Sequence, residues 1–243
     1  MTSLSKRKHV WRWLLVVLVF LGLGYGLLVG LSGLRRNATR QHRLNVLDQL
    51  GMALATFDAV YDRLPPAARL DESGEPLSSW RFQMCPYLES FMQDVDYDKP
   101  WDDPVNREIA TYFAGFFRGS TRGDRPTRFH TNVMVVTGPG TPFDGQKECR
   151  LADLDPDTIL VVEVAESGVH WMEPGDLSID NLPASLVKGI DGDGLCVLFA
   201  DGSAWFLGND VSLEDLKKFL TIDGAEQYDR EKILGPHARK RSP

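Results

Sequence analysis

The chain has 243 residues, with 27 basic and 34 acidic side chains and a formal net charge of −7 at neutral pH. Residues 1–43 contain eight basic side chains and no acidic one, which leaves 19 basic and 34 acidic residues, a net charge of −15, in residues 44–243. An acidic globular part lacks the basic surface that neutralises phosphates. The composition therefore argues against a nucleic-acid-binding protein.

An uncharged apolar run occupies residues 14–34, LLVVLVFLGLGYGLLVGLSGL. At about 1.5 Å of rise per residue, a helix needs roughly 20 apolar residues to cross the hydrocarbon core of a bilayer. A cleaved signal peptide has a shorter apolar core, of about 7–15 residues, and a small-residue cleavage site. A buried core helix usually contains charges over such a length. We therefore expect a single-pass transmembrane anchor at residues 14–34, embedded in the lipid bilayer.

Three glycines of this run, Gly22, Gly26 and Gly30, recur every four residues and share one helix face. Small residues at this spacing let two membrane helices approach closely, although glycine is also simply frequent in membrane helices. We expect these glycines to be the helix–helix packing residues, with the same chain or similar subunits as partners.

Basic residues flank the anchor equally, so charge alone leaves its orientation open. The flank with more Lys and Arg generally faces the cytoplasm. Here each flank has four of them: Lys6, Arg7, Lys8 and Arg12 before the anchor, and Arg35, Arg36, Arg40 and Arg43 after it.

Helical periodicity continues beyond the anchor. Apolar residues recur at steps of three and four: Leu44, Leu47, Leu50, Leu54, Phe57 and Tyr61. Pro65 and Pro66 then end the helix, because proline lacks an amide hydrogen and restricts the residue before it. The pattern predicts an amphipathic helix over residues 35–63 whose apolar stripe needs a cover.

Four runs rich in β-branched and aromatic residues predict the strands that cover it, at residues 132–137, 158–164, 195–200 and 203–207. Asp201-Gly202 predicts a two-residue hairpin turn between the last two strands. Ser212, with Asp215 three residues later, predicts the capped start of a helix over residues 213–220.

The remaining segments are richer in loops. We expect a short helix over residues 80–91 despite Pro86, an ordered loop over residues 94–108, and a flexible basic tail over residues 227–243.

These segments follow one another in an order that is typical of one family. The segments are LGMALATFDAVYDRLPPA, SSWRFQMCPYLE, DYDKPWDDPVNRE, VVTGPGTPFDG, RLADLDPDTILVVEVAESGVHWMEPGDL and LCVLFADGSAWFLGNDVSLEDLKKFLT. Over residues 44–226 the chain resembles a family of pseudopilin-like, membrane-anchored proteins of unknown function that is abundant in planctomycete bacteria. The resemblance implies a pilin-like layout, in which the N-terminal helix lies half in the membrane and half on an antiparallel sheet, and it implies export of the domain.

The N-terminus departs from that family. Residues 6–18, KRKHVWRWLLVVL, lack the Gly-Phe junction and the Glu of the prepilin signal. The family's Cys-Pro-Ser is replaced within residues 111–118, and its His-Pro-Gly-Gly is replaced by residues 190–194. These departures argue against prepilin processing and against incorporation into a pilus.

No hydrolase, zincin or phosphate-loop motif is present, and the two histidines of the domain, His130 and His170, are isolated. Cys85, Cys149 and Cys196 contain no C-x-x-C pair, which argues against a zinc site. We expect no enzyme activity, no cofactor and buried, apolar roles for the cysteines.

Calcium remains an alternative, because hard cations prefer clustered carboxylates. Aspartates alternate at two places, Asp153, Asp155 and Asp157 in the first and Asp191 and Asp193 in the second. The other interpretation of both is a turn before a strand.

The sequence thus predicts an α+β protein with a short basic tail at residues 1–13, an anchor at 14–34, an amphipathic helix at 35–63, an exported domain at 64–226 and a flexible tail at 227–243. We expect a non-enzymatic, pseudopilin-like scaffold or a component of a secretion or pilus-related assembly. It would lie in the inner membrane with its C-terminal domain in the periplasm. The alternatives are a membrane-tethered binding module that does not assemble, and an uncharacterised envelope hydrolase.

Overall fold

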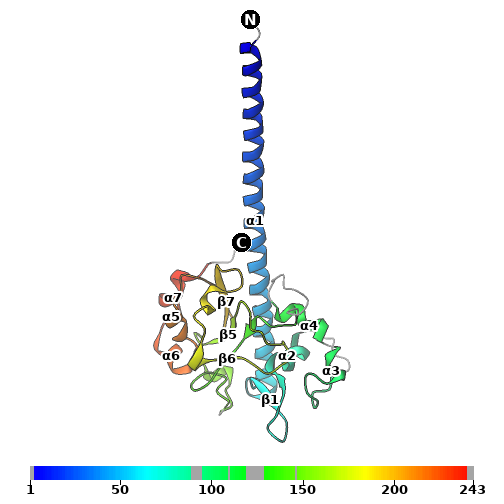
Figure 1. Cartoon of the computed structure of the whole chain (residues 1–243). Coiled ribbons are helices and arrows are strands. Elements are labelled where there is room, and N and C mark those ends of the chain that lie inside the picture. The colour runs from blue at the N-terminus through cyan, green and yellow to red at the C-terminus, as the bar shows by residue number, and fades with distance from the viewer. Residues whose placement is uncertain (1–2, 89–94, 109, 119–128, 146, 240–243) are drawn as a thin grey trace. The chain divides into compact units, whose positions relative to one another are not determined.

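The computed structural model describes residues 3–88, 95–108, 110–118, 129–145 and 147–239. Its mixture of helices and antiparallel strands confirms the predicted α+β class. The chain divides into two compact units, residues 1–41 and residues 42–241. The helix α1, Ser3–Tyr61, contributes to both units (Figure 1).

The first unit is the N-terminal part of α1, which includes the predicted anchor at residues 14–34. The structure describes only some side chains of this run, and each large apolar one among them is at least 51 % exposed: Leu18, Phe20, Leu21, Tyr25, Leu31 and Leu34. A Cβ atom added to Gly22, Gly26 or Gly30 would meet no atom within 4 Å. Across the residues described, no helix reaches the length and hydropathy that crossing a membrane requires.

In the second unit, α1 forms the centre of the hydrophobic core. The predicted stripe is buried from Leu44 to Phe57, whereas Tyr61, its last member, is 51 % exposed. The helix ends at Tyr61, two residues before the predicted end, and Asp62 adopts a positive φ of 58°. The periodicity therefore predicted which face of this helix packs inward.

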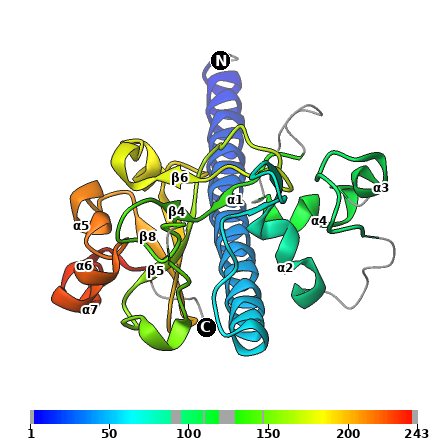
Figure 2. The ribbon, with the colours of Figure 1, turned by 90° about the horizontal axis from the view of Figure 1, so that it is seen from below.

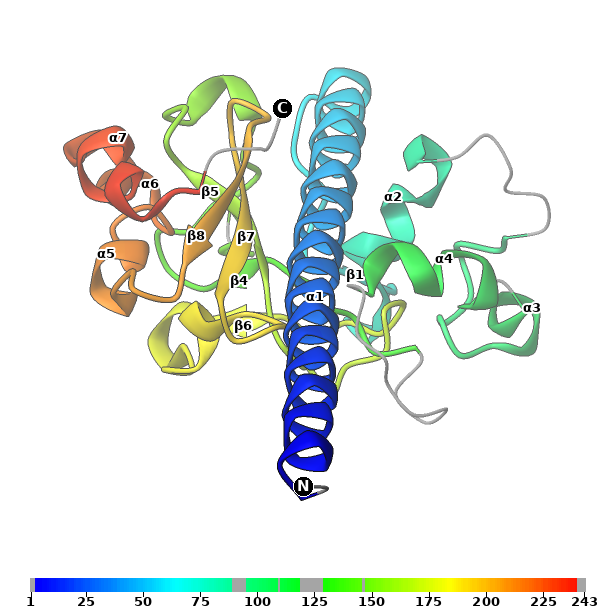
Figure 3. The same cartoon turned by 90° about the horizontal axis from the view of Figure 1, so that it is seen from above.

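A four-stranded antiparallel sheet covers one side of this helix. Its strand order is β3-β5-β7-β8, formed by Val133–Met134, Ile159–Glu163, Gly194–Phe199 and Ala204–Gly208. Figure 2 and Figure 3 show β5, β7 and β8 on one side of α1, and α2, α3 and α4 on the other. All four strands confirm predicted runs, although the predicted strand 132–137 is divided between β3 and β4, Val136–Thr137.

Both faces of this sheet are buried. In β7, Cys196 and Leu198 face the core that contains α1, whereas Leu195, Val197 and Phe199 face a second core under the C-terminal helices. Successive side chains of a strand point to opposite faces, which explains why five consecutive apolar residues are buried.

The hairpin between β7 and β8 differs from the predicted two-residue turn. The N–H of Phe199 donates to the carbonyl of Ser203, and the N–H of Gly202 donates to the carbonyl of Phe199. The loop therefore contains three residues, 200–202, with Gly202 at a φ of 81°. Asp201 keeps a negative φ, so the chain adopts a type I turn followed by a left-handed glycine.

The domain also contains two small sheets and three further helices. Strands β1, Ala68–Leu70, and β2, Pro76–Ser79, are antiparallel, whereas β4 pairs with β6, Leu177–Ser178, in parallel, a pairing that the sequence did not predict. The helices are α2, Trp80–Leu88; α3, Pro104–Arg107; and α4, Ala110–Phe117. Residues 89–91 of the predicted helix lie outside the described residues.

The predicted loop over residues 94–108 contains α3 and is stabilised by a buried amide. Nδ2 of Asn106 donates to the carbonyls of Asp96, at 2.9 Å, and Pro100, at 3.0 Å. Asp103 caps α3 by accepting a hydrogen bond from the N–H of Val105.

The helix predicted over residues 213–220 is α5, Leu213–Lys217, and α6, Ile222–Gln227, follows it. The predicted flexible tail, residues 227–243, contains a further helix, α7, Arg230–Ile233, although periodicity is lost there. Short 3-10 helices lie at Leu151–Asp153, Ile179–Asn181, Leu186–Lys188 and Gly235–His237. Leu234 is fully buried, and Arg230 pairs with Asp157 and Asp201. Residues 240–243 lie outside the described part.

We expect replacement of Leu50 by Ala to destabilise the domain by about 2–5 kcal/mol, because this fully buried side chain of α1 would leave a cavity in the core. Gln49→Ala, at the adjacent exposed position of the same helix, is the control and should change stability by less than about 0.5 kcal/mol. Urea unfolding of the full chain in detergent, followed by circular dichroism, measures both. Equal stability of the two variants would contradict this packing.

Candidate functional site

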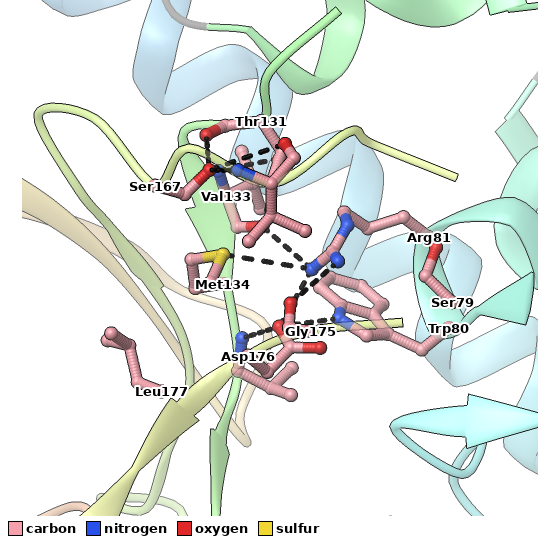
Figure 4. Close-up of polar contacts among 12 residues, drawn as sticks. Ser79, Trp80, Arg81, Thr131, Val133, Met134, Ser167, Gly175, Asp176 and Leu177 are labelled. Carbon is pink, nitrogen blue, oxygen red and sulfur yellow. Dashed lines mark hydrogen bonds and ion pairs between the residues drawn. The ribbon is translucent and has the colours of Figure 1, made fainter. Parts of the chain in front are cut away.

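The most elaborate polar centre of the domain surrounds Arg81 (Figure 4). Arg81 lies in the first turn of α2, which Ser79 caps by accepting a hydrogen bond from the N–H of Phe82 at 3.2 Å. The side chains of Arg81 and Asp176 form an ion pair with an Nη1–Oδ1 distance of 2.7 Å. They are 0 % and 2 % exposed, respectively, so the pair is removed from water.

Five oxygen acceptors satisfy the guanidinium group. Besides Asp176, they are the carbonyl oxygens of Val133 at 3.2 Å, Trp171 at 3.0 Å, Glu173 at 3.2 Å and Gly175 at 3.0 Å. An arginine has five N–H donors, so none remains for a ligand.

Three groups donate hydrogen bonds to Asp176. Its Oδ1 accepts hydrogen bonds from Nε1 of Trp80, at 3.2 Å, and from the N–H of Val135, at 3.0 Å, as well as from Arg81. Burial raises the pKa of Asp176, although Arg81 and these hydrogen bonds act in the opposite direction. The centre is built to join α2, the strand region at 133–135 and the loop before β6, rather than to bind a substrate.

The two histidines that the sequence singles out lie together. His130 and His170 form an isolated antiparallel bridge. The ring of His170 packs against Trp101, with centroids 4.7 Å apart, and against Phe129, at 5.3 Å. Its Nδ1 accepts a hydrogen bond from the N–H of Met172 at 3.2 Å.

Burial, with His130 and Arg81 nearby, lowers the pKa of His170 to about 4. A neutral imidazole packed between two rings has the environment of a core residue. This arrangement gives no specific support to the hydrolase alternative.

The aspartates considered for calcium make contacts within the protein. Asp155 accepts a hydrogen bond from the N–H of Asp157 at 2.9 Å, which is the predicted turn before β5. Asp157 pairs with Arg230 at 3.0 Å, and Asp191 pairs with Arg43 at 3.1 Å. Within the described ranges, no group of three or more His, Cys, Asp or Glu side chains could hold a metal ion.

All three cysteines are free thiols, and Cys85 and Cys196 are buried as expected, whereas Cys149 is half-buried. Burial raises the pKa of Cys149 to about 11, with Asp153, Asp144 and Asp58 adding to the effect.

The candidate binding site is an aromatic groove at the C-terminal end of α1. It has a volume of about 390 Å³, and its principal lining residues are Phe57, Tyr61, Arg69, Gln83, Tyr87 and Tyr97. They come from the last turns of α1, from β1, from α2 and from the loop before α3. Its size is within the range of about 300–1,000 Å³ that is usual for ligand pockets.

The rings of this groove support one another. Phe57 lies 4.5 Å from Tyr61 and 5.7 Å from Tyr87, measured between ring centroids. Burial and a hydrogen bond with Tyr61 raise the pKa of Tyr87 to about 12, so the phenol stays protonated and can donate. This groove could not be predicted from the sequence, because its residues come from four separate segments and only Phe57 and Tyr61 belong to a periodic pattern.

Comparison with known proteins gives a similarity to one family and no function. Residues 35–150 match the family model described as protein of unknown function (DUF1559). This span includes all the groove residues and Arg81, whereas Asp176 lies beyond it. No curated protein and no solved structure matches the chain. The chain is therefore similar to a family of unknown function over this span.

We expect Asp176→Asn to destabilise the domain by about 3–5 kcal/mol, because it leaves the buried guanidinium of Arg81 without a counter-charge. Glu214→Gln removes a surface pair with Lys217, in which the glutamate side chain is 81 % exposed, and should cost less than about 1 kcal/mol. Denaturant unfolding compares the two. A small loss for Asp176→Asn would mean that the ion pair does not constrain the fold.

The low pKa of His170 predicts a loss of stability in acid. Its folded-state pKa of about 4 lies below the usual 6.5, so the unfolded chain binds more protons between these values. The contribution is complete above about pH 6.5 and decreases as the pH falls towards 4. Because solvent screens this partly exposed group, we expect a loss of about 1–2 kcal/mol.

Unfolding at pH 7 and pH 4.5 measures this loss, and His170→Gln should reduce the difference between the two conditions. His42→Gln, at an exposed histidine outside this aromatic cluster, provides the control. The same pH dependence in the His170 variant would contradict the assignment.

Proposed function

We propose that this chain is a non-enzymatic, membrane-anchored envelope protein of pseudopilin-like layout. It acts as a scaffold or as a component of a secretion or pilus-related assembly. The observation that carries the proposal is that one helix, α1, contains both the uncharged run at residues 14–34 and the stripe from Leu44 to Phe57 that the domain buries.

The two apolar parts of α1 need different surroundings. The stripe from Leu44 to Phe57 is covered by the four-stranded sheet and α2, within one hydrophobic core. In contrast, the described apolar side chains of residues 18–34 are exposed, as Phe20 at 70 % and Tyr25 at 72 % illustrate. A lipid bilayer is the environment that would accept such a run, since about 20 apolar residues match its thickness.

The proposed location follows from the resemblance to pseudopilin-like proteins. In that layout the N-terminal helix is inserted in the cytoplasmic membrane and the domain lies on the periplasmic side. Gly22, Gly26 and Gly30 would then present a small-residue face to a neighbouring membrane helix.

Two observations support a non-enzymatic role. The donors of Arg81 are used by oxygen atoms of the same domain, and His170 is packed between rings with a low pKa. Neither group is poised for acid–base chemistry at neutral pH.

A second candidate is a membrane-tethered binding module that does not assemble. The missing Gly-Phe junction and Glu in residues 6–18 favour it, and so does the aromatic groove, which gives the domain a binding surface.

We expect the chain to remain in the membrane fraction after carbonate extraction and to migrate as a larger complex on blue-native gels. Gly26→Ile should shrink that complex, because a branched side chain prevents close approach of helix backbones. Leu21→Ile changes the shape of an exposed apolar side chain away from the glycine face and should leave the complex intact. A monomer that stays in the membrane would favour the tethered module over the scaffold.

Release by carbonate would overturn the anchor itself. The compartment of the domain is measured separately, with phosphatase and fluorescent-protein fusions after Pro243. Phosphatase activity without fluorescence is the expected result, and the reverse would refute the periplasmic location.

A further inference from the structure

The imidazole ring of His170 fixes a tight turn of the chain. Its Nδ1 accepts a hydrogen bond from the N–H of Met172 at 3.2 Å, which assigns the proton of the neutral ring to Nε2. A further proton can then attach only at Nδ1. There it would face the N–H of Met172, and two donors cannot form a hydrogen bond with each other. Protonation of His170 is therefore incompatible with this turn.

The residues of this turn also hold α2 and α4. The carbonyl of Met172 accepts a hydrogen bond from the N–H of Ser79 at 2.9 Å, directly before α2. The carbonyl of Trp171 accepts one from Nε of Arg81 at 3.0 Å, and Nε1 of Trp171 donates to the carbonyl of Ala110 in α4 at 3.0 Å. Opening of the turn would therefore loosen the contacts of both helices.

The groups near the ring disfavour a proton there. Burial, His130 and Arg81 lower the pKa of His170 to about 4. Nδ1 of His130 is itself buried and has no hydrogen-bond partner among the described residues. The carboxylate of Glu173 accepts a hydrogen bond from the backbone N–H of His170 at 3.3 Å. In the part of the chain that the structure describes, no carboxylate forms an ion pair with the ring of His170.

The segment around Trp101 packs against the other side of this ring, with ring centroids 4.7 Å apart. The charged residues nearest to Trp101 in sequence are Lys99, Asp102 and Asp103. Lys99 pairs with Asp103 at 4.0 Å, and Asp102 is exposed. A positively charged His170 would therefore gain stability by leaving this position for water.

The central strands of the sheet are held without this turn. β5 pairs with β7, and β7 pairs with β8. Glu163 of β5 is joined to Arg43 of α1, and Leu195 and Val197 of β7 pack in the second core under the C-terminal helices. An opening at His170 can therefore be local.

We propose that His170 is a pH-sensitive switch for the side of the domain that contains α2 and α4. A proton on Nδ1 of His170 breaks the hydrogen bond from Met172. Residues 170–176 then separate from both helices, while β5, β7 and β8 stay paired. The switch depends on contacts inside the domain, so it is independent of the membrane anchor and of the proposed function.

Hydrogen–deuterium exchange of the full chain in non-ionic detergent, measured by mass spectrometry and corrected for the intrinsic effect of pH, tests the proposal. Exchange in a folded protein follows the population of locally open forms. Between pH 7 and pH 4.5, we expect exchange in residues 170–176 and in the first turn of α2 to accelerate about tenfold. Exchange in β5 and β7 should change by less than about twofold.

The pH profile of the wild type identifies the titrating group. The acceleration should begin below about pH 6.5, where an open His170 binds a proton, and should level off by about pH 4. Exposed carboxylates bind protons only near pH 4, so they would give a later rise. An acceleration that begins only near pH 4 would contradict the assignment to His170.

His170→Gln removes the titrating group but keeps a side-chain oxygen that can accept from the N–H of Met172. It should match the wild type at pH 7 and should not accelerate at pH 4.5. His237→Gln is the matched control, because the ring of His237 lies 2.7 Å from Asp210 in another part of the domain, and it should keep the acceleration. Equal acceleration in β5 and β7 would mean global unfolding in acid and would overturn the proposal. An unchanged rate in residues 170–176, or a wild-type response in His170→Gln, would do the same.

Discussion

The domain depends on the buried ion pair between Arg81 and Asp176. Each charge would be unstable in the core by itself, since removing an ion from water costs several kcal/mol, so each depends on the presence of the other. Through its five acceptors, Arg81 fixes the start of α2 against Val133 and against the chain from Trp171 to Asp176. These segments are distant in sequence and have little regular secondary structure. The polar centre thus holds together the segments on the side near α2, as the sheet does on the opposite side.

A second buried pair performs the same task for the sheet. Arg43, at the start of the part of α1 that belongs to the domain, contacts Glu163 of β5, and both side chains are at most 4 % exposed. Glu163 also accepts a hydrogen bond from the N–H of Cys196 in β7 at 3.3 Å. One carboxylate therefore links the helix to two neighbouring strands. These contacts fix the position of α1 along its axis, whereas the apolar stripe fixes its rotation about that axis.

Periodic elements of this fold could be predicted from the sequence, because burial on one face imposes a period. The stripe from Leu44 to Phe57, the strands β5, β7 and β8, and the cap at Ser212 all follow from local patterns.

The helices after Gln227 could not be predicted this way, since Leu234 is their one fully buried apolar residue and ion pairs of Arg230 hold them in place. The groove and the polar centre depend on contacts between residues up to 96 positions apart, which no local pattern encodes. Arg43 illustrates the same limit. Its place in the sequence suggests a charge that flanks the membrane anchor, but its side chain is buried in the core of the domain.

The distribution of the three thiols has a practical consequence. Cys85 and Cys196 are fully buried, whereas the half-buried Cys149 lines the cavity beside the aromatic groove. The natural chain therefore contains a single accessible attachment point for a thiol-reactive dye, and it lies beside the surface of most interest. Because the pKa of Cys149 is raised to about 11, labelling would proceed slowly at neutral pH and faster in mild alkali. A dye there would report on the environment of the groove without any engineered cysteine.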